Sequence, residues 1–253
     1  MSGTAAYDAL IRKNSNVSSF ITTDQFLRVF RGIQYANYRG YILNTELTIA
    51  WKCAGIDAPS DVDRMNMRAM DRIRKFLEYR KIPVFYYGVF ENGILNGYHF
   101  HAAIYVPPLY KSQFKDCLKK MARDFALPHL VNDFVRGVIR RADKTGAQWR
   151  WFQYCMKGLD PVVYRDVVKF PYDKDMNTLV GVQRRNPGVV EIDRVRIARS
   201  MGPKARMDAG YRAELDITRA EWQSCYTDAE YKRGKLDRRS EEVTQSFANM
   251  DLI

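Results

Sequence analysis

The chain has few of the residues and segments on which several protein classes depend. No apolar run is long enough to span a bilayer, and the N-terminus lacks the pattern of a secretory signal peptide. The four cysteines fit neither zinc-finger spacing nor a disulfide framework: Cys53, Cys117, Cys155 and Cys225. We therefore expect reduced thiols, a cytoplasmic location and no membrane partner.

The chain also lacks a phosphate-binding loop, and its acidic residues are outnumbered by its basic residues. No Gly-x-x-x-x-Gly-Lys-Ser/Thr sequence is present, which argues against a nucleotide-driven helicase. Lys and Arg number 41 against 29 Asp and Glu, a net charge of +12 that favours a polyanionic partner. Residues 111–157 alone hold 11 basic and 4 acidic residues. Binding along a phosphate backbone requires such a segment, although a solvated helix face is the alternative.

Length and patterning indicate one α+β domain with an appended piece. The 253 residues are 46% hydrophobic, which allows a well-filled core. The order of elements predicts a central, mainly antiparallel β-sheet flanked by helices. Helices are expected at 21–38, from Ser60 as N-cap to 77, at 111–126 and at 147–159, and strands at 40–51, 84–91, 97–107 and 130–140. We expect residues 1–20 to be flexible, and residues 166–253 to form a mostly helical extension whose last twenty residues or so are disordered.

Two of the three histidines are separated by a single residue in the expected strand at 97–107. Side chains two residues apart share one face of a strand, so His99 and His101 point together. The other face carries the apolar side chains that would enter a core: Phe100, Ala102, Ile104 and Val106. Two adjacent imidazoles form half of a divalent-metal site. A pair of surface histidines is the alternative for an isolated His-x-His.

We expect Glu91 to lie beside these imidazoles. Two Asn-Gly dipeptides, Asn92-Gly93 and Asn96-Gly97, separate the strand that ends at Glu91 from the histidine strand, and they predict a tight hairpin. Two histidines and one carboxylate make an open site that suits Mn²⁺, with Mg²⁺ as a second candidate. A hairpin-end carboxylate that faces water is the alternative.

The helix expected at 147–159 carries a candidate nucleophile. At about 100° per residue, Tyr154 and Lys157 fall together on its polar side, near Arg150. A cation or metal ion close to a phenol helps it to act as a nucleophile. Apolar residues form a stripe on the other side: Trp151, Phe152, Cys155, Met156 and Leu159. Taken alone, Tyr-x-x-Lys is usually an exposed helix face.

Together these segments resemble the HUH (His-hydrophobe-His) endonucleases, specifically the rolling-circle replication initiators. The matching segments are residues 43–51 as the first strand motif, Glu91 as the upstream carboxylate, His99-Phe100-His101 as the metal motif and Tyr154-Cys155-Met156-Lys157 as the catalytic helix motif. Some members carry a second tyrosine one turn away, where this chain has Arg150 and Gly158, which indicates the single-tyrosine class. The resemblance implies an HUH-type domain at 21–165 and assigns no function to residues 166–253.

The resemblance implies metal-dependent nicking of single-stranded origin DNA from a small circular plasmid or phage genome. His99, His101 and Glu91 would hold Mn²⁺ or Mg²⁺ against the scissile phosphate. Tyr154 would become joined to the 5′ phosphate and leave a free 3′-OH, and the same site could rejoin strands. Lys157 would neutralise charge on the phosphate or help to keep the tyrosine deprotonated.

Several residues near the tyrosine are candidate contacts to DNA. The candidate backbone contacts are Arg140, Arg141, Lys144 and Arg150. Trp149 could stack on a base, and a place in the core is equally compatible with the sequence. Host replication proteins are further candidate partners, and the oligomeric state stays open.

Two other readings of the function remain. A single-tyrosine transposase or a relaxase would use the same chemistry, although Tyr154 follows the histidines, which argues against a relaxase. A non-catalytic nucleic-acid-binding protein would use His99 and His101 only as structural residues. We expect His129 to be a structural or surface histidine.

Overall fold

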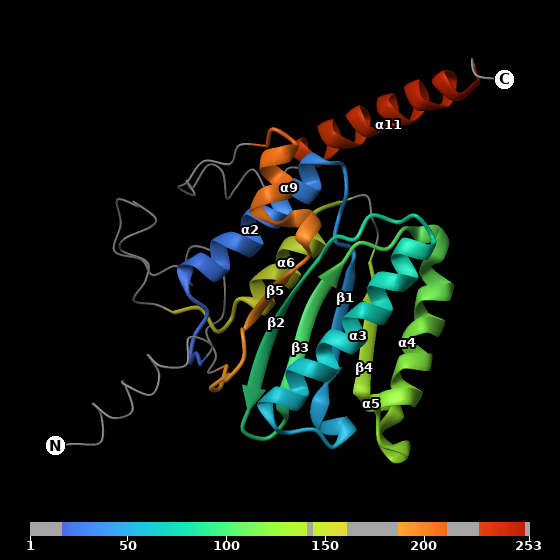
Figure 1. The fold of residues 1–253 in the computed structure, drawn as a ribbon. Coiled ribbons are helices and arrows are strands. Elements are labelled where there is room, and N and C mark those ends of the chain that lie inside the picture. The colour runs from blue at the N-terminus through green and yellow to red at the C-terminus, as the bar shows by residue number, and fades with distance from the viewer. Residues whose placement is uncertain (1–16, 141–143, 161–186, 212–227, 251–253) are drawn as a thin grey trace.

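A five-stranded antiparallel sheet forms the centre of the molecule (Figure 1). The computed structural model describes residues 17–140, 144–160, 187–211 and 228–250, and in the last range the side chains only as far as residue 242. The strand order is β4-β1-β3-β2-β5. The strands are β1 (Thr45–Ala50), β2 (Tyr86–Gly93), β3 (Gly97–Ile104), β4 (Val135–Ile139) and β5 (Val195–Ile197). The α+β architecture with an antiparallel sheet and flanking helices is therefore confirmed.

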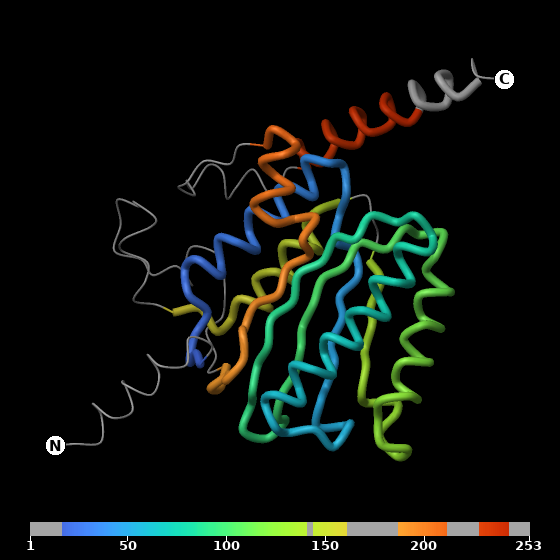
Figure 2. The backbone as a smooth tube through the Cα atoms, in the orientation of Figure 1, coloured from blue at the N-terminus to red at the C-terminus, as the bar shows by residue number. Residues whose placement is uncertain are grey.

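Helices cover both faces of this sheet (Figures 1 and 2). One face packs on α3 (Pro59–Tyr79) and α4 (Lys111–Phe125), and the other on α2 (Thr23–Tyr38) and α6 (Gly146–Cys155). The remaining α-helices that the structure describes are the short α5 (Val131–Phe134) and α9 (Pro203–Asp208) and the long α11 (Ala229–Met250). No helix among the described residues is both long and apolar enough to cross a membrane.

Local sequence explains several element ends. A capping box begins α2, because Thr22 accepts from the Gln25 backbone N–H while the Gln25 side chain accepts from the Thr22 N–H. The expectation that Ser60 caps α3 is wrong. Pro59 is already helical and Ala58 is the N-cap, because proline, with its fixed φ, fits the first helical turn.

Strand β3 divides its residues between two cores. Phe100 and Ala102 lie in the cluster under α3 and α4, as expected, together with Leu47 and Ile49 of β1. Gly88 on β2 leaves room for the Phe100 ring, since an added Cβ would come within 2.0 Å of Phe100 Cζ. The opposite face carries His99 and His101 and borders the cluster formed with α2 and α6.

The chain beyond residue 165 contributes to the same sheet. Strand β5 pairs with β2, so the expected extension is not purely helical. Arg194, fully buried before β5, donates to the carbonyls of Ser18 and of Phe90 on β2, which ties three distant segments together. Burial lowers the pKa of this guanidinium to about 10.

Other boundaries differ from the expected ones. The strand expected at 130–140 is a short helix, α5, followed by β4, which begins only at Val135. The helix expected at 147–159 ends at Cys155. Helix α11 covers residues 229–250, a range that includes most of the last twenty residues, for which we expected disorder. The expectation of a flexible N-terminus concerns mainly residues 1–16, which lie outside the described residues, while Ser18 pairs with Val190.

Candidate active site

The β2–β3 hairpin brings the predicted acid beside the predicted histidines. Glu91 is the direct cross-strand partner of His99, and Val89 is the partner of His101. On the shared face, one carboxylate oxygen of Glu91 (Oε2) lies 3.4 Å from His101 Nε2. The two imidazole rings are nearly parallel, with their centroids 6.1 Å apart. The expectation that a hairpin places Glu91 next to the histidines therefore agrees with the geometry.

Hydrogen bonds orient both rings through the same nitrogen. His99 Nδ1 lies 3.1 Å from the Gly97 carbonyl, so this nitrogen donates and Nε2 carries the lone pair in the neutral ring. His101 Nδ1 lies 3.0 Å from the Thr48 hydroxyl. Burial lowers the pKa of His99, and the Gly97 bond offsets this only in part. Histidines that bind metals are commonly held in this way, with the second nitrogen fixed by a neighbouring group.

Glu91 is a mostly buried carboxylate with one free oxygen. Its Oε2 atom lies 2.8 Å from Lys157 Nζ, whereas its Oε1 atom is buried and has no hydrogen-bond partner. Burial raises the pKa of this carboxyl, but His101 and then Lys157 outweigh burial and bring the pKa below its usual value. The side chain is therefore an ionised acceptor at neutral pH.

The end of α6 places Tyr154 over this cluster. The Tyr154 ring packs edge-on against His101, with centroids 5.2 Å apart, and stacks on Trp151 at 4.9 Å. Trp151 is itself fixed by a hydrogen bond from its indole N–H to the Ala102 carbonyl on β3. Tyr154 remains 41% exposed, so a substrate can reach the phenol from solvent.

Lys157 lies in the turn after α6 rather than on the helix. Its ammonium sits 3.9 Å from the centre of the Tyr154 ring and pairs with Glu91, although the side chain is largely buried. Burial lowers the pKa of Lys157, and the neighbouring Glu91 and Tyr154 more than offset this, so the net shift is upward. One buried cation thus connects the predicted nucleophile with a predicted metal ligand.

The donor set fits a divalent ion in its chemistry. Among the described residues, no group of three or more His, Cys, Asp or Glu side chains is placed so that it could hold a metal ion as it stands. The unpartnered Glu91 Oε1 nevertheless supplies an oxygen next to two imidazoles whose Nδ1 atoms are engaged elsewhere. Two imidazole nitrogens and one carboxylate oxygen suit Mn²⁺, and Mg²⁺ less well.

The predicted DNA contacts have mixed outcomes. Trp149 is buried between Phe30 and Phe152, so the idea that it stacks a base is wrong. Its place on α6 puts it on the same side as Phe152, facing α2 rather than the site. Lys144 and Arg150 are exposed, and Arg141 lies outside the described residues. Arg140 is exposed but forms a two-pronged ion pair with Glu46, with which a phosphate would have to compete.

Sequence reasoning missed two residues on this face. Thr48 pairs with His101 across β1 and β3, and Arg136 of β4 pairs with Thr48 on the other side. Direct cross-strand partners share a face, so Arg136, Thr48 and His101 form one row across the sheet. Arg136 is exposed. The alternation in β1 could have identified Thr48, but no local signal aligns β4 with it.

The comparisons with known proteins found no relative of this chain. No protein-family model matches the chain, and no curated protein or solved structure is significantly similar to it.

Proposed function

We propose that this protein nicks and rejoins single-stranded DNA with Tyr154 as nucleophile, as a single-tyrosine initiator of rolling-circle replication with an HUH-type fold. The observation that carries the proposal is the position of the Tyr154 phenol. It is open to solvent, packs against His101 and lies over the ammonium of Lys157. An exposed tyrosine with those neighbours is unusual for a residue that serves only packing.

The proposed reaction is a transesterification. The Tyr154 hydroxyl oxygen attacks the scissile phosphorus and loses its proton to solvent. The bond between phosphorus and the 3′ oxygen breaks, and that oxygen takes up a proton to become a free 3′-OH. The 5′ phosphate stays joined to the tyrosine as a phosphodiester, so attack by a 3′-OH reverses the step and rejoins strands.

The surrounding residues have distinct roles in this proposal. Lys157 stabilises negative charge on the phenol oxygen and on the phosphate as it develops. His99, His101 and Glu91, through its free Oε1, would hold Mn²⁺ or Mg²⁺, whose contribution is Lewis-acid polarisation of the scissile phosphate. Thr48 keeps the His101 ring in place through the bond to Nδ1.

The charge of the chain supports a nucleic-acid substrate. Its net charge is +12, and Arg136 is exposed on the face of the sheet that bears the histidines. A strand of DNA that crosses this face would bring phosphates to Arg136 and to Tyr154. The acidic side chain Glu46 is already paired with Arg140, which limits its repulsion of the DNA.

A covalent adduct tests the proposal. The full-length protein is incubated with Mn²⁺ and with labelled single-stranded fragments that tile the DNA flanking its gene, and adducts are separated on a denaturing gel. We expect one fragment to give a protein–DNA adduct and a product with a free 3′-OH. Tyr154→Phe should abolish both products, because a ring without the hydroxyl cannot form the phosphodiester.

Tyr79→Phe is the matched control, because Tyr79 is 87% exposed and lies on α3, on the other side of the sheet. This variant should form adduct at the wild-type rate. If no fragment yields an adduct with Mn²⁺ or Mg²⁺, or if Tyr154→Phe yields as much as the wild type, the proposed activity is wrong.

A further inference from the structure

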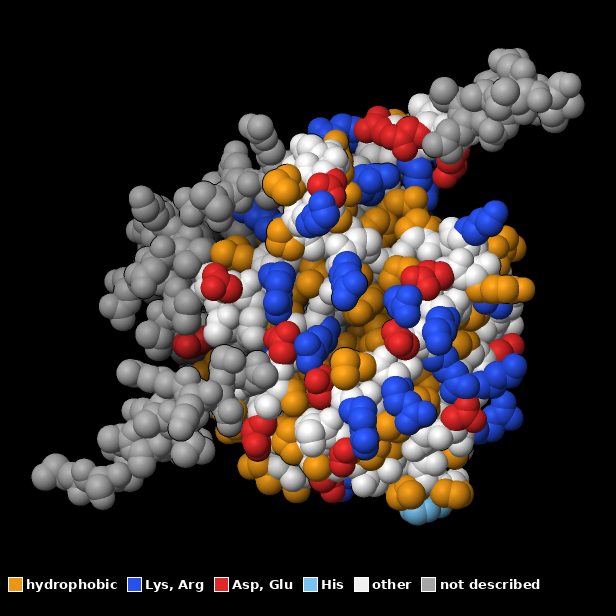
Figure 3. Space-filling view, viewed as in Figure 1, with side chains coloured by type: hydrophobic (Ala, Val, Ile, Leu, Met, Phe, Trp, Pro, Cys, Tyr) orange, Lys and Arg blue, Asp and Glu red, His pale blue; other side chains and the backbone are white. Residues whose placement is uncertain are grey.

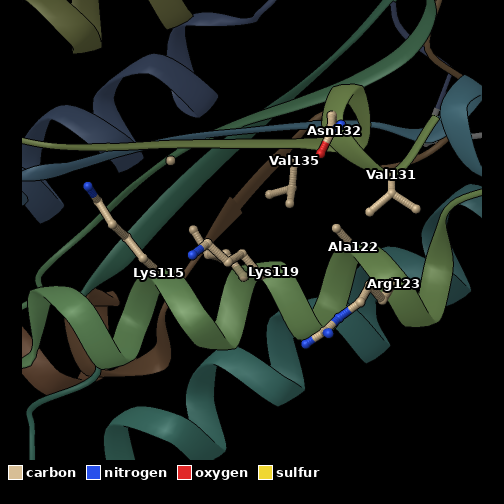
Figure 4. Close-up of a pocket in the computed structure, with 9 residues that line it drawn as sticks. Lys115, Lys119, Ala122, Arg123, Val131, Asn132 and Val135 are labelled. Carbon is tan, nitrogen blue, oxygen red and sulfur yellow. The ribbon is translucent and has the colours of Figure 1, made fainter. Parts of the chain in front are cut away.

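A groove runs along the free edge of the sheet, between α4 and β4. Its volume is about 450 Å³. Figure 4 shows Lys115 and Lys119 on α4, with Val131, Asn132 and Val135 across the gap. Apolar side chains also line it: Leu118, Ala122, Val131 and Val135. The groove belongs to the α3–α4 side of the sheet, since a Cβ on Gly137 would come within 2.5 Å of Leu118.

The edge strand offers unpaired backbone groups to this groove. Strand β4 is the last strand in the order, and its Arg140 N–H donates to the Asn44 carbonyl at 2.7 Å. Backbone groups alternate in direction along an antiparallel strand. The N–H and C=O groups of Val135, Gly137 and Ile139 therefore point away from β1. Among the described residues, none forms a backbone hydrogen bond with these groups from outside.

Two lysines of α4 point toward the groove, whereas the guanidinium of Arg123, which also lines it, points away from Val131 and Val135 (Figure 4). Lys115, Lys119 and Arg123 follow one another at intervals of four residues on α4, which is about 6 Å of helix rise. Lys119 has a long, exposed contact of 3.6 Å with Asp116. Figure 3 shows further Lys and Arg side chains spread over the α3 and α4 surface.

We propose that this groove binds an extended acidic segment of a partner protein, which adds to β4 as a sixth strand. Side chains two residues apart on the added strand face α4 at intervals of about 6.6–6.8 Å. Carboxylates at those positions match the spacing of Lys115 and Lys119, and their methylene groups can rest on Leu118 and Ala122. Backbone hydrogen bonds to Val135, Gly137 and Ile139 supply the rest of the interaction.

The charge and chemistry of the groove favour this occupant over two others. A second copy of the chain would bring the same cations against Lys115 and Lys119, so like charges oppose pairing of two β4 edges. A DNA strand has no row of amide groups to match the strand edge and leaves the apolar floor uncovered. The groove also lies on the face opposite Tyr154, so the inference does not depend on the nicking activity.

A designed peptide tests the inference. The probe is a fluorescein-labelled eight-residue peptide in which glutamate and threonine alternate, titrated with the full-length protein while anisotropy is recorded. We expect saturable binding with a Kd below about 1 mM. Lys115→Glu with Lys119→Glu should weaken it about tenfold, because two attractions become repulsions. Lys75→Glu with Lys120→Glu, the same charge change at two exposed lysines outside the groove, should change it less than about twofold.

Two further probes separate the contributions. A peptide with lysine in place of glutamate should not bind, and a peptide N-methylated at alternate residues should bind at least about tenfold more weakly, because it loses the backbone pairing. The proposal is overturned if the acidic peptide fails to saturate, or if the two double variants weaken it equally. It is also overturned if the groove variant loses single-stranded oligonucleotide binding as strongly as peptide binding, which would make the groove a DNA surface. The groove variant should form the Tyr154 adduct normally.

Discussion

The two faces of the central sheet are built from the same strands but bury different kinds of side chain. Under α3 and α4, β3 contributes Phe100 and Ala102 to an apolar core. The residues on either side of Phe100, His99 and His101, point to the opposite face. There they form a polar cluster with Glu91 and the largely buried Lys157. Removing charged and polar groups from water costs free energy unless they are paired. The polar cluster therefore costs stability, which the apolar clusters on both faces of the sheet supply.

The two faces also differ in the kind of polar group that each one buries. The α3–α4 face is filled mainly by apolar side chains, although Trp51 Nε1 and Asn66 Oδ1 are buried there without a hydrogen bond. On the other face, Glu91 Oε1 is left buried without a hydrogen bond. What sets the histidine face apart is that ionisable groups gather there, since Glu91 contacts both His101 and the largely buried Lys157. Such a cluster among well-packed elements is typical of a functional site rather than of a folding core.

The largest effect on stability should come from the apolar face. Phe100→Ala removes a fully buried ring that packs on Phe90 at 4.7 Å between centroids, and we expect it to lower the free energy of unfolding by about 3–5 kcal/mol. His99→Ala on the opposite face should cost less than about 1 kcal/mol. Urea unfolding followed by circular dichroism measures both. Equal losses would show that both faces act as core.

Removal of the shared acid should have an intermediate effect. Glu91→Gln leaves the largely buried Lys157 ammonium without its carboxylate, so we expect a loss of about 1–3 kcal/mol in the free energy of unfolding. The same variant should weaken Mn²⁺ binding, measured by calorimetry, by at least about tenfold. Asp61→Asn, which alters the exposed pair with Arg64, is the control and should cost less than about 0.5 kcal/mol. A variant as stable as this control and with unchanged Mn²⁺ affinity would contradict the assignment of Glu91.

Much of this cluster could be predicted because its causes are local. Alternation within β3 sets His99 apart from Phe100, and the Asn-Gly turns place Glu91 opposite His99. The same approach left the position of Trp149 undecided between the core and a base contact, since its environment depends on where α2 packs. It failed for β5, whose three residues are too short to give a periodic signal.

The ion pair between Glu91 and Lys157 could not be predicted from the sequence, for a different reason. It depends on α6 ending at Cys155, so that Lys157 turns inward, and on the approach of two elements far apart in the chain. Likewise, Thr48 and Arg136 join His101 only through the pairing of β1 with β3 and β4. Sequence reasoning placed residues on faces, whereas the contacts between elements required the structure.

The ion pair should also make stability depend on pH at both extremes. The pKa of Glu91 is lowered on balance, because His101 and Lys157 outweigh the upward effect of burial, so its contribution is present above the unfolded pKa of about 4.3 and is lost as pH falls through the folded pKa. The pKa of Lys157 is raised on balance, since Glu91 and Tyr154 outweigh the downward effect of burial. Its contribution is present below about 10.4 and is lost as pH rises through the folded pKa.

A double variant removes both charges of the ion pair. The difference in free energy of unfolding between the wild type and Glu91→Gln with Lys157→Met should stay constant from about pH 7 to pH 9 and change outside that window. The lower limit is set by His99, which interacts with both groups and whose pKa burial lowers from its usual 6.5. Urea titrations at several pH values measure it. A difference that does not change with pH would mean that the two charges contribute nothing to folding.

The smallest effect should come from the open part of the histidine face. Arg136→Ala removes an exposed guanidinium in the row with Thr48 and His101, so the free energy of unfolding should change by less than about 0.5 kcal/mol. If DNA crosses this face, the variant should bind a single-stranded oligonucleotide about threefold more weakly and lower the slope of log K against log salt by about 0.7. Arg68→Ala, an exposed arginine on α3, is the matched control and should leave both quantities unchanged. Equal effects of the two variants would mean that the charge of the whole chain, rather than this face, attracts the DNA.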